Sequence, residues 1–247
     1  MVRYYKRRHF IKVKISWFGY QYNFWDLFSF NAIMHLKGYA NKKAPGIPMN
    51  SHTLELSLEQ DTEVIFSNFS KQIRQQTKIA EQEGIKCYFH ENVNSFVEFF
   101  NDFAARKNTY STSLERMEEM GGNLKLSFAE YNGEVLAAHS YLIDKELGIV
   151  RHFHSATKRL DETNDRNLVG RANKYLTVHN IMAFKDSGYK LFDFGGYAEG
   201  TQDESLAGIN KYKLLFGGKV VPCANYYSYS YWLIKKIGNL FGSRGDV

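Results

Sequence analysis

The chain has 247 residues, of which 44% are hydrophobic, 16% aromatic and 23% charged, and its formal net charge is +6. This composition indicates a soluble globular protein with one large domain, or one domain and a partial second, and the modest basic excess excludes a dedicated DNA-binding protein. Cys87 and Cys223 are too few for a disulfide framework and match no zinc motif, so we expect a reducing compartment and no bound metal.

The N-terminal segment predicts a strand and not a leader peptide. It starts basic but has no continuous apolar region, and no window of the chain reaches a transmembrane length, so we expect a cytoplasmic protein. Apolar and polar residues alternate over residues 11–17, as in a half-buried strand. The aromatic-rich stretch that follows has no clear assignment. Residues 41–51 contain two prolines and predict a loop.

This loop suggests the division of the chain. We expect residues 1–50 to form a partial N-terminal subdomain and residues 51–230 to form the main domain. Residues 231–247 are expected to form a C-terminal amphipathic helix. Its apolar face either packs on its own domain or lies on a membrane surface, which would place the protein at the inner face of the membrane. No oligomeric state follows from the sequence.

The first half of the main domain predicts two strands and three helices. Leu54, Leu56 and Leu58 alternate as in a strand, and a single helix is expected over residues 62–83, stopped by Gly84. On that helix Lys71, Arg74 and Lys78 share one face, which is either solvated or directed at a phosphate of the substrate. A short strand at 85–90 and helices at 94–108 and 111–120 follow. Asn94 or Ser95 would cap the first of these helices, and Ser111 or Ser113 the second.

The second half predicts an antiparallel meander over residues 124–155. Asn132-Gly133 is a strong two-residue hairpin signal. A helix over 167–187 ends before Gly188, and a strand, a helix and further strands follow, at residues 189–194, 206–216 and 219–230. This order predicts a mixed α/β fold with a largely antiparallel sheet flanked by helices.

The start of the helix at residue 167 is a candidate anion site. Asn167 to Ala172 read NLVGRA, and free backbone N–H groups and the helix dipole attract a phosphate at such a place. The candidate cofactor-binding residues are Arg166, Asn167, Gly170, Arg171 and Ala172. The alternative is an ordinary helix start in which Gly170 permits close packing.

Two motifs resemble a known superfamily. NLVGRA is similar to the Q/R-x-x-G-x-G/A signature of the GNAT acyltransferases, with Asn167 in the first position. LFDFGG at 191–196 and YKLLFGG at 212–218 resemble the glycine pairs of the Fem-type peptidoglycan-bridge aminoacyltransferases. This likeness covers roughly residues 60–230, and the chain is too short for the two domains of the full-length bridge enzymes.

The resemblance implies a GNAT-like fold and an N-acyltransferase. The donor would be acetyl-CoA or another acyl-CoA, and the acceptor an amino sugar carried by a nucleotide or lipid phosphate in envelope polysaccharide synthesis. The alternatives are an aminoacyl-tRNA-dependent transferase of the bridge type and a non-catalytic binding module on the same fold.

In this architecture the strands at 148–155 and 189–194 diverge and hold the acyl chain between them. His152 and His154 are expected on one face of the first strand, where either could accept the amine proton, with His139 nearby on the partner strand. The alternative is that these histidines are bonded within the sheet.

The glycine pairs would complete the substrate pocket. Asp193 either binds the acceptor amine or acts as base, or it holds the turn through backbone N–H groups. Tyr197 is a candidate proton donor to the leaving group, and Gly195 and Gly196 clear space for the acceptor. The resemblance assigns Lys213 to the phosphates of the acceptor.

Overall fold

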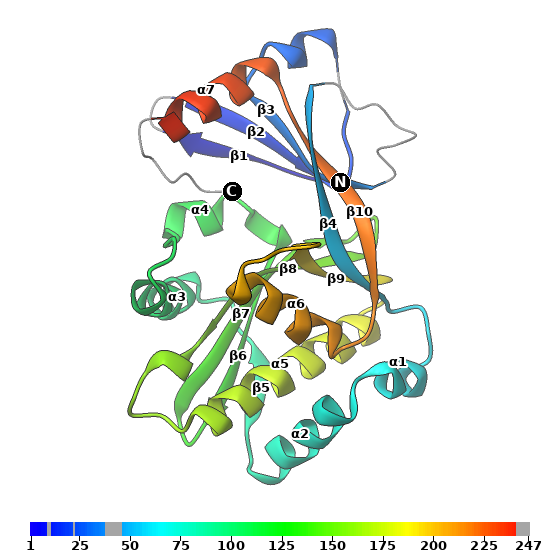
Figure 1. The fold of residues 1–247 in the computed structure, drawn as a ribbon, viewed down its shortest axis with the longest axis vertical. Coiled ribbons are helices and arrows are strands. Elements are labelled where there is room, and N and C mark those ends of the chain that lie inside the picture. Colours follow the sequence, from blue (N-terminus) through cyan, green and yellow to red (C-terminus); the bar gives the residue numbers. More distant parts are fainter. Residues whose placement is uncertain (9–10, 22, 38–45, 241–247) are drawn as a thin grey trace. The chain divides into compact units, whose positions relative to one another are not determined.

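The computed structural model describes residues 1–8, 11–21, 23–37 and 46–240, and the chain divides into two compact units (Figure 1). Unit 1 consists of Met1–Thr53 and Val220–Val247, and unit 2 of Leu54–Lys219. The chain passes between the units twice, within strand β4 (Ile47–Ser57) and at the start of strand β10 (Lys219–Tyr227). Unit 2 is therefore an insertion into the sequence of unit 1. The domain division expected at residues 50 and 230 stays a prediction.

Unit 1 is built on a mixed sheet with the strand order β1-β2-β3-β10-β4. Its first three strands are β1 (Val2–Arg8), β2 (Ile11–Trp17) and β3 (Asn31–Lys37). β1 and β2 are antiparallel, β2 and β3 are parallel, and β10 pairs with β3 in the antiparallel sense. The alternation predicted for β2 is confirmed, because Val13, Ile15 and Trp17 are all buried.

The described part of unit 1 also contains two helical elements. The 3-10 helix η1 (Phe24–Leu27) lies in the aromatic-rich stretch between β2 and β3, and α7 (Tyr229–Leu240) follows β10. The predicted C-terminal helix thus begins two residues earlier than expected, and residues 241–247 lie outside the described residues. The loop predicted at 41–51 is wrong from Ile47 onward, because β4 already begins there and a strand tolerates Pro48 near its first residue.

Unit 2 contains a sheet with the strand order β4-β9-β8-β7-β6-β5. The strands are β5 (Lys86–Phe89), β6 (Leu124–Tyr131), β7 (Glu134–Asp144), β8 (Ile149–Thr157) and β9 (Leu191–Tyr197). The meander β6–β8 is confirmed as antiparallel. Asn132 and Gly133 both have positive φ, of 50° and 83°, as the tight hairpin turn between β6 and β7 requires.

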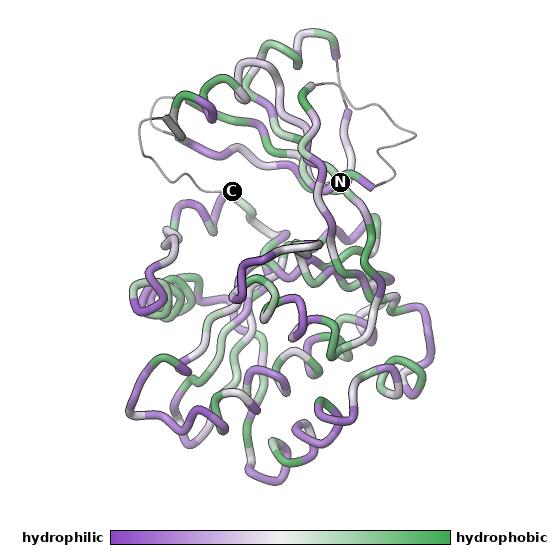
Figure 2. Tube along the Cα trace, in the orientation of Figure 1, coloured by the Kyte–Doolittle hydropathy of each residue, from purple (hydrophilic) through white to green (hydrophobic). Residues whose placement is uncertain are grey.

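Helices cover this sheet on both faces. They are α1 (Thr62–Asn68), α2 (Lys71–Gln82), α3 (Val93–Lys107), α4 (Leu114–Glu118), α5 (Arg166–Asp186) and α6 (Glu204–Leu214). α5 packs on β6 and β7 and is in turn covered by α2, while α3 packs on β7 and β8. Figure 2 shows that α2 is mainly hydrophilic, as expected of an outer helix. The structure therefore confirms the mixed α/β class and its largely antiparallel sheet.

Two helix predictions need correction. The single helix expected over residues 62–83 is interrupted, because Phe69 adopts an extended backbone and Ser70 caps a new helix by accepting a hydrogen bond from the Ile73 backbone N–H. The cap of α3 is Asn92, whose side chain accepts from the Ser95 N–H, and not Asn94 or Ser95. The cap of α4 is Ser113, one of the two serines expected.

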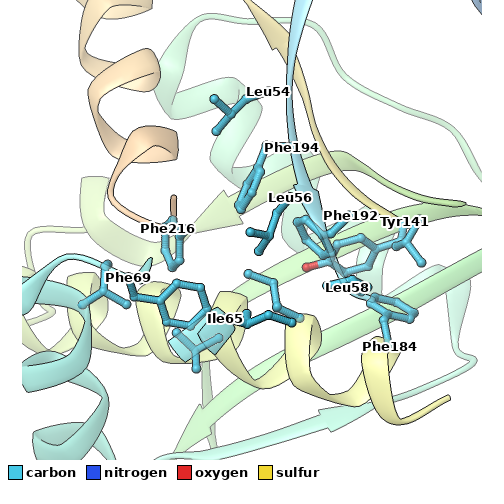
Figure 3. Close-up of a cluster of buried hydrophobic side chains, with 14 of the residues drawn as sticks. Leu54, Leu56, Leu58, Ile65, Phe69, Tyr141, Phe184, Phe192, Phe194 and Phe216 are labelled. Carbon is cyan, nitrogen blue, oxygen red and sulfur yellow. The ribbon is translucent and has the colours of Figure 1, made fainter. Parts of the chain in front are cut away.

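The core of unit 2 lies between β4, β9, α5 and α6 (Figure 3). Leu54, Leu56 and Leu58 are each at most 3% exposed, which confirms the predicted strand. Phe194 of β9 packs on Phe216, with ring centroids 5.7 Å apart. Burial of this apolar surface anchors β9 at the point where it leaves its neighbour β8. Within the described residues, no helix combines the length and apolar character needed to cross a bilayer.

Candidate active site

Strands β8 and β9 diverge soon after they begin. Their parallel register joins Ile149 to Leu191, Val150 to Phe192 and Arg151 to Asp193, and no further pair follows between these described strands. β8 nevertheless continues to Thr157 and β9 to Tyr197. Beyond Arg151 and Asp193 the two strands therefore share no regular ladder of backbone pairs. This is the divergence that the GNAT resemblance predicts.

A buried ion pair marks the point of divergence. Asp193 is fully buried, and its Oδ2 accepts a hydrogen bond from Arg151 Nη1 at 2.6 Å. Its Oδ1 accepts one from the Gly195 backbone N–H at 2.8 Å. The sequence left three roles open for this carboxylate, namely binding the acceptor amine, acting as base and holding the turn. These contacts favour the third, because both oxygens are used to fix Arg151 and the glycine turn.

The first glycine pair serves two different purposes. Gly195 has φ of +80°, and a Cβ atom there would lie 3.1 Å from the His152 carbonyl oxygen. A larger residue would therefore be strained and crowded against β8. A Cβ at Gly196 would meet nothing within 4 Å, and the Gly196 carbonyl instead accepts a hydrogen bond from Lys213 Nζ at 2.6 Å.

Lys213 joins Arg151 and Asp193 in one charged cluster. Its Nζ and Arg151 Nη2 lie 3.8 and 3.9 Å from the position that a Cβ of Gly195 would occupy. Burial and, to a smaller extent, repulsion by Arg151 lower the pKa of Lys213 to about 8, and Asp193 partly opposes both effects. The Glu55 carboxylate lies within 4.8 Å of that of Asp193, so the formal charges of the two cations and two carboxylates balance. An anionic group of a substrate would bind through the hydrogen-bond donors of Arg151 and Lys213.

The structure corrects the placement of the two candidate histidines. The register pairs Ser140 with His154 and Tyr141 with His152, so Phe153 is an extra residue in β8. Such a bulge turns the flanking side chains to opposite faces of the sheet. The prediction that His152 and His154 share one face is therefore wrong.

His152 lies on the face covered by α5. Its ring stacks on Tyr141, with centroids 5.0 Å apart, and the His139 ring centroid is 4.5 Å away. Its Nε2 donates to the His154 carbonyl at 3.1 Å, whereas Nδ1 has no hydrogen-bond partner among the described residues. Burial lowers its pKa well below the usual value, and His139 and Lys213 lower it further. His152 is therefore a neutral imidazole with a free lone pair on Nδ1.

Both ring nitrogens of His139 are hydrogen-bonded within a buried network. Its Nδ1 lies 3.1 Å from the Tyr141 hydroxyl, and its Nε2 lies 2.7 Å from Asn173 Oδ1. Burial lowers its pKa to about 4. Asn173 Nδ2 in turn donates to the Tyr212 hydroxyl at 2.9 Å, and that hydroxyl lies 3.2 Å from Thr177 Oγ1. The network ties β7, α5 and α6 together, so these contacts favour the structural alternative for His139.

The sequence analysis did not single out the polar residues of α5. Asn173, Thr177 and Asn180 lie at i, i+4 and i+7, which places them on one face of the helix. Asn180 is fully buried and donates to Ser127 Oγ at 2.7 Å and to the Tyr141 hydroxyl at 2.8 Å. Polar residues at this spacing in an otherwise apolar helix face were the signal that could have revealed the network.

His154 lies on the opposite face, among aromatic residues. Its Nδ1 is 2.7 Å from Ser140 Oγ, and its ring centroid is 4.8 Å from that of Phe100 on α3. Burial lowers its pKa to about 3. The other catalytic candidate, Tyr197, is half-buried at the end of β9 and packs against the core of unit 2. His152 and Lys213 thus gather where β8 and β9 diverge, and His154 does not join them.

The start of α5 differs from the predicted pyrophosphate site. The Asp165 carboxylate caps the helix by accepting from the Asn167 N–H at 2.8 Å. Gly170 lies inside the helix, and Ala172 is fully buried. The Arg171 guanidinium makes two hydrogen bonds to the carboxylate of Glu83, the residue that follows α2. A carboxylate at the helix start and a neutralised arginine do not fit the pyrophosphate of coenzyme A.

Three other candidate cations lie on α5 and α2. Arg166 is exposed at the first turn of α5. Lys71 is exposed at the first turn of α2. Arg74 Nη1 donates to the carbonyl oxygens of Ser67 and Phe69, both at 2.6 Å, and so caps the end of α1. The basic stripe predicted on a single helix therefore includes a residue that stabilises the break between two helices.

Comparison with known proteins identifies the fold. No protein-family model and no curated sequence matches the chain. Among solved structures, the DUF2156 C-terminal domain of a lysylphosphatidylglycerol synthetase from Agrobacterium fabrum is similar, with a TM-score of 0.65 at 12% identity over 99% of this chain and 87% of that one. The structure of FemX gives a TM-score of 0.65 at 10% identity, over 94% of this chain and 85% of that one.

A third solved structure agrees with these two. L-PGS from Bacillus licheniformis gives a TM-score of 0.60 at 10% identity, over 98% of this chain and 86% of that one. Such low identities establish a common fold and leave the chemistry open. The chain therefore has the α/β fold seen in FemX and in these two other structures, in agreement with the fold that its two glycine pairs predicted.

Proposed function

We propose that this chain is a transferase that moves an acyl group from an activated donor to an amine on a phosphate-bearing acceptor. The observation that carries the proposal is the divergence of β8 and β9, with His152 and the cluster of Arg151, Asp193 and Lys213 at its base. An opened strand pair offers backbone groups to an acyl chain, and Arg151 and Lys213 supply charged hydrogen-bond donors for an anion.

In the proposed reaction, the acceptor amine attacks the donor carbonyl carbon. A C–N bond forms, the C–S or C–O bond to the donor carrier breaks, and the amine loses a proton. We assign this proton to Nδ1 of His152, since that nitrogen has a free lone pair. Tyr197 remains the candidate that returns a proton to the leaving group. Arg151 and Lys213 would hold the phosphate of the acceptor and so orient its amine.

The contacts at the start of α5 help to choose between two candidate donors. The resemblance favours acetyl-CoA or another acyl-CoA, whereas Asp165 and the Arg171–Glu83 pair oppose a pyrophosphate at that helix. These contacts favour an aminoacyl ester such as aminoacyl-tRNA as the second candidate donor. The lysylphosphatidylglycerol in the name of one similar protein is an aminoacyl ester on a phosphate-bearing lipid, which supports an acceptor with a phosphate.

The acceptor is proposed to be an amino sugar linked to a nucleotide or lipid phosphate, as in envelope polysaccharide synthesis. A thermal-shift screen compares acyl-CoAs, nucleotide-linked amino sugars and aminoacyl-tRNA, because a ligand of the native state raises its melting temperature. The ligands that shift it are then combined, and transfer is followed by mass spectrometry of the acceptor. Stabilisation by acyl-CoA would identify the first donor class, and stabilisation by aminoacyl-tRNA alone the second.

The role of His152 is tested with two matched variants. His152→Gln is expected to lower kcat by about 100-fold, the usual contribution of a general base, without a large change in melting temperature. The control is His90→Gln, at an exposed histidine in the segment between β5 and α3. Full activity of His152→Gln would contradict the assignment. Ligand binding without any turnover in the native protein would instead indicate a binding module on this fold.

A further inference from the structure

The two units differ sharply in charge. Unit 1 contains twelve Lys and Arg residues against two Asp and Glu residues, a formal charge of +10. Unit 2 contains 20 basic against 24 acidic residues, a formal charge of −4. The net charge of +6 is therefore the sum of a strongly basic unit and a slightly acidic one. A charge of this size on so small a unit attracts an anionic surface.

Large aromatic side chains are exposed on the same unit. In and next to η1, Phe24 is 65% exposed, Trp25 72% and Phe28 56%. The three rings form one group, with Phe24 5.7 Å from Trp25 and 5.9 Å from Phe28 between centroids. Phenyl and indole rings held in water in such a group are unfavourable unless they bind something.

Helix α7 adds an apolar stripe on its solvent side. Tyr229, Leu233 and Ile237 lie at i, i+4 and i+8 and are 49%, 53% and 45% exposed. Tyr231 is buried, so the helix packs on unit 1 through a different face. Figure 2 shows the alternation of hydrophobic and hydrophilic residues along α7. A packed helix normally turns polar residues to solvent, and α7 departs from this rule.

The stripe and the ring group form a single surface. Ser230 Oγ donates to the Phe28 carbonyl at 2.7 Å, and the Phe28 and Tyr229 ring centroids are 6.1 Å apart. We name as the aromatic patch the residues Phe24, Trp25, Phe28, Tyr229, Leu233 and Ile237. The one acidic side chain on η1, Asp26, is 3.7 Å from Lys14 Nζ and caps its own helix, so it adds little unbalanced negative charge.

Lysines accompany the patch on α7. Lys236 Nζ lies 4.5 Å from the Trp232 ring centroid, and Lys235 Nζ lies 4.6 Å from that of Tyr227. Long basic side chains that lie against aromatic rings can extend to a charged surface while their stems cover apolar groups. Exposed Trp, Phe, Leu and Ile beside Lys are the composition of a helix that lies in a lipid headgroup layer.

We propose that unit 1 docks on an anionic lipid bilayer through the aromatic patch. The rings and aliphatic side chains enter the headgroup region, and the +10 charge of the unit binds the anionic lipids. RNA is a poorer fit, because Leu233 and Ile237 offer nothing to a phosphate backbone or to a base. The inference rests on unit 1 alone and stands whether or not unit 2 performs the proposed transfer.

The test is sedimentation of the full chain with vesicles. Phosphatidylcholine vesicles are compared with vesicles that contain about 30% phosphatidylglycerol, at about 0.1 M and about 0.5 M salt. The variant Trp25→Ser/Leu233→Ser removes two exposed members of the patch. The control Val64→Ser/Leu206→Ser removes two exposed apolar residues of unit 2, which are 44% and 43% exposed. Melting temperatures and circular dichroism check that each variant is folded.

We expect the native chain and the control to bind the anionic vesicles at low salt. The patch variant should need at least about tenfold more lipid for half-maximal binding, since two apolar side chains no longer enter the bilayer. Absence of native binding to anionic vesicles, or equal binding by both double variants, would overturn the proposal. Tighter binding of RNA than of vesicles, lost in the patch variant, would assign the surface to nucleic acid instead.

Discussion

The two units use the same residue types in opposite ways. In unit 2, Phe192, Phe194 and Phe216 are at most 3% exposed, while in unit 1 Trp25 and Phe28 are more than half exposed. Unit 2 buries an ion pair between strands β8 and β9, and unit 1 carries its charge as an excess over the whole unit. The lesson is that a net charge of +6 and an aromatic content of 16% are averages over two units that expose and bury these residues differently.

The largest loss of stability is expected when the buried ion pair of unit 2 is removed. Asp193→Ala leaves the Arg151 guanidinium, 15% exposed, without its carboxylate. We expect a loss of about 3–5 kcal/mol in the free energy of unfolding, the usual cost of removing one partner of a buried pair. Urea denaturation measures it, with the exposed Asp186→Ala as control. An unchanged midpoint for Asp193→Ala would show that unit 2 does not depend on this pair.

The buried network on α5 is expected to have a smaller effect. Asn180→Ala removes two hydrogen bonds, to Ser127 and Tyr141, inside a fully buried environment. We expect a loss of about 2 kcal/mol, since the partner hydroxyls lose a donor and no water replaces it. Asn94→Ala, at an exposed asparagine of α3, is the matched control. Equal urea midpoints for the two variants would contradict the structural role of the network.

The buried Lys213 should make the stability of unit 2 depend on pH. Its pKa of about 8 in the folded chain lies below the ordinary value of 10.5, so the unfolded chain binds more protons between these two pH values. Stability should therefore rise as pH increases from about 8 to about 10.5, because the cost of burying the ammonium is relieved. Lys213→Met should flatten this rise, and Lys211→Met, at an exposed lysine, should not.

The same titration predicts how an anionic acceptor binds. As pH rises through about 8, Lys213 loses its charge and the affinity for a phosphate-bearing acceptor should fall by about tenfold. Isothermal titration with the acceptor found in the ligand screen measures this fall. A pH-independent affinity would remove Lys213 from the acceptor site, although its effect on stability would remain.

The smallest effect is expected in unit 1. Trp25→Ser changes a large side chain that is 72% exposed, so the free energy of unfolding should change by no more than about 0.5 kcal/mol. Thermal and urea denaturation of the full chain measure it. A loss of several kcal/mol would mean that Trp25 packs within the native protein, and the contrast between the units would disappear.

Local signals predicted much of unit 2. Asn132-Gly133 fixed the hairpin because both residues accept positive φ, and the alternation of Leu54, Leu56 and Leu58 gave a strand. The D-F-G-G segment led to the divergence of β8 and β9 through its resemblance. These features depend on neighbours in the chain, which is why the sequence alone reveals them.

The missed features depend on contacts between distant segments. Because Phe153 is an extra residue in β8, His152 and His154 point to opposite faces of the sheet. No glycine marks this bulge in the sequence. Arg171 looked free until Glu83, 88 residues earlier, proved to be its partner. The position of β10 between β3 and β4 was equally hidden, since the strands of unit 1 come from both ends of the chain.

The insertion of unit 2 into unit 1 has a consequence for synthesis of the protein. A ribosome releases β3 before the whole of Leu54–Lys219 and releases β10 only afterwards. The contiguous unit is complete first, while the early strands wait for a partner that has yet to be translated. During that interval their unpaired edges are open to other chains, so slow translation of the final segment would favour aggregation of nascent protein.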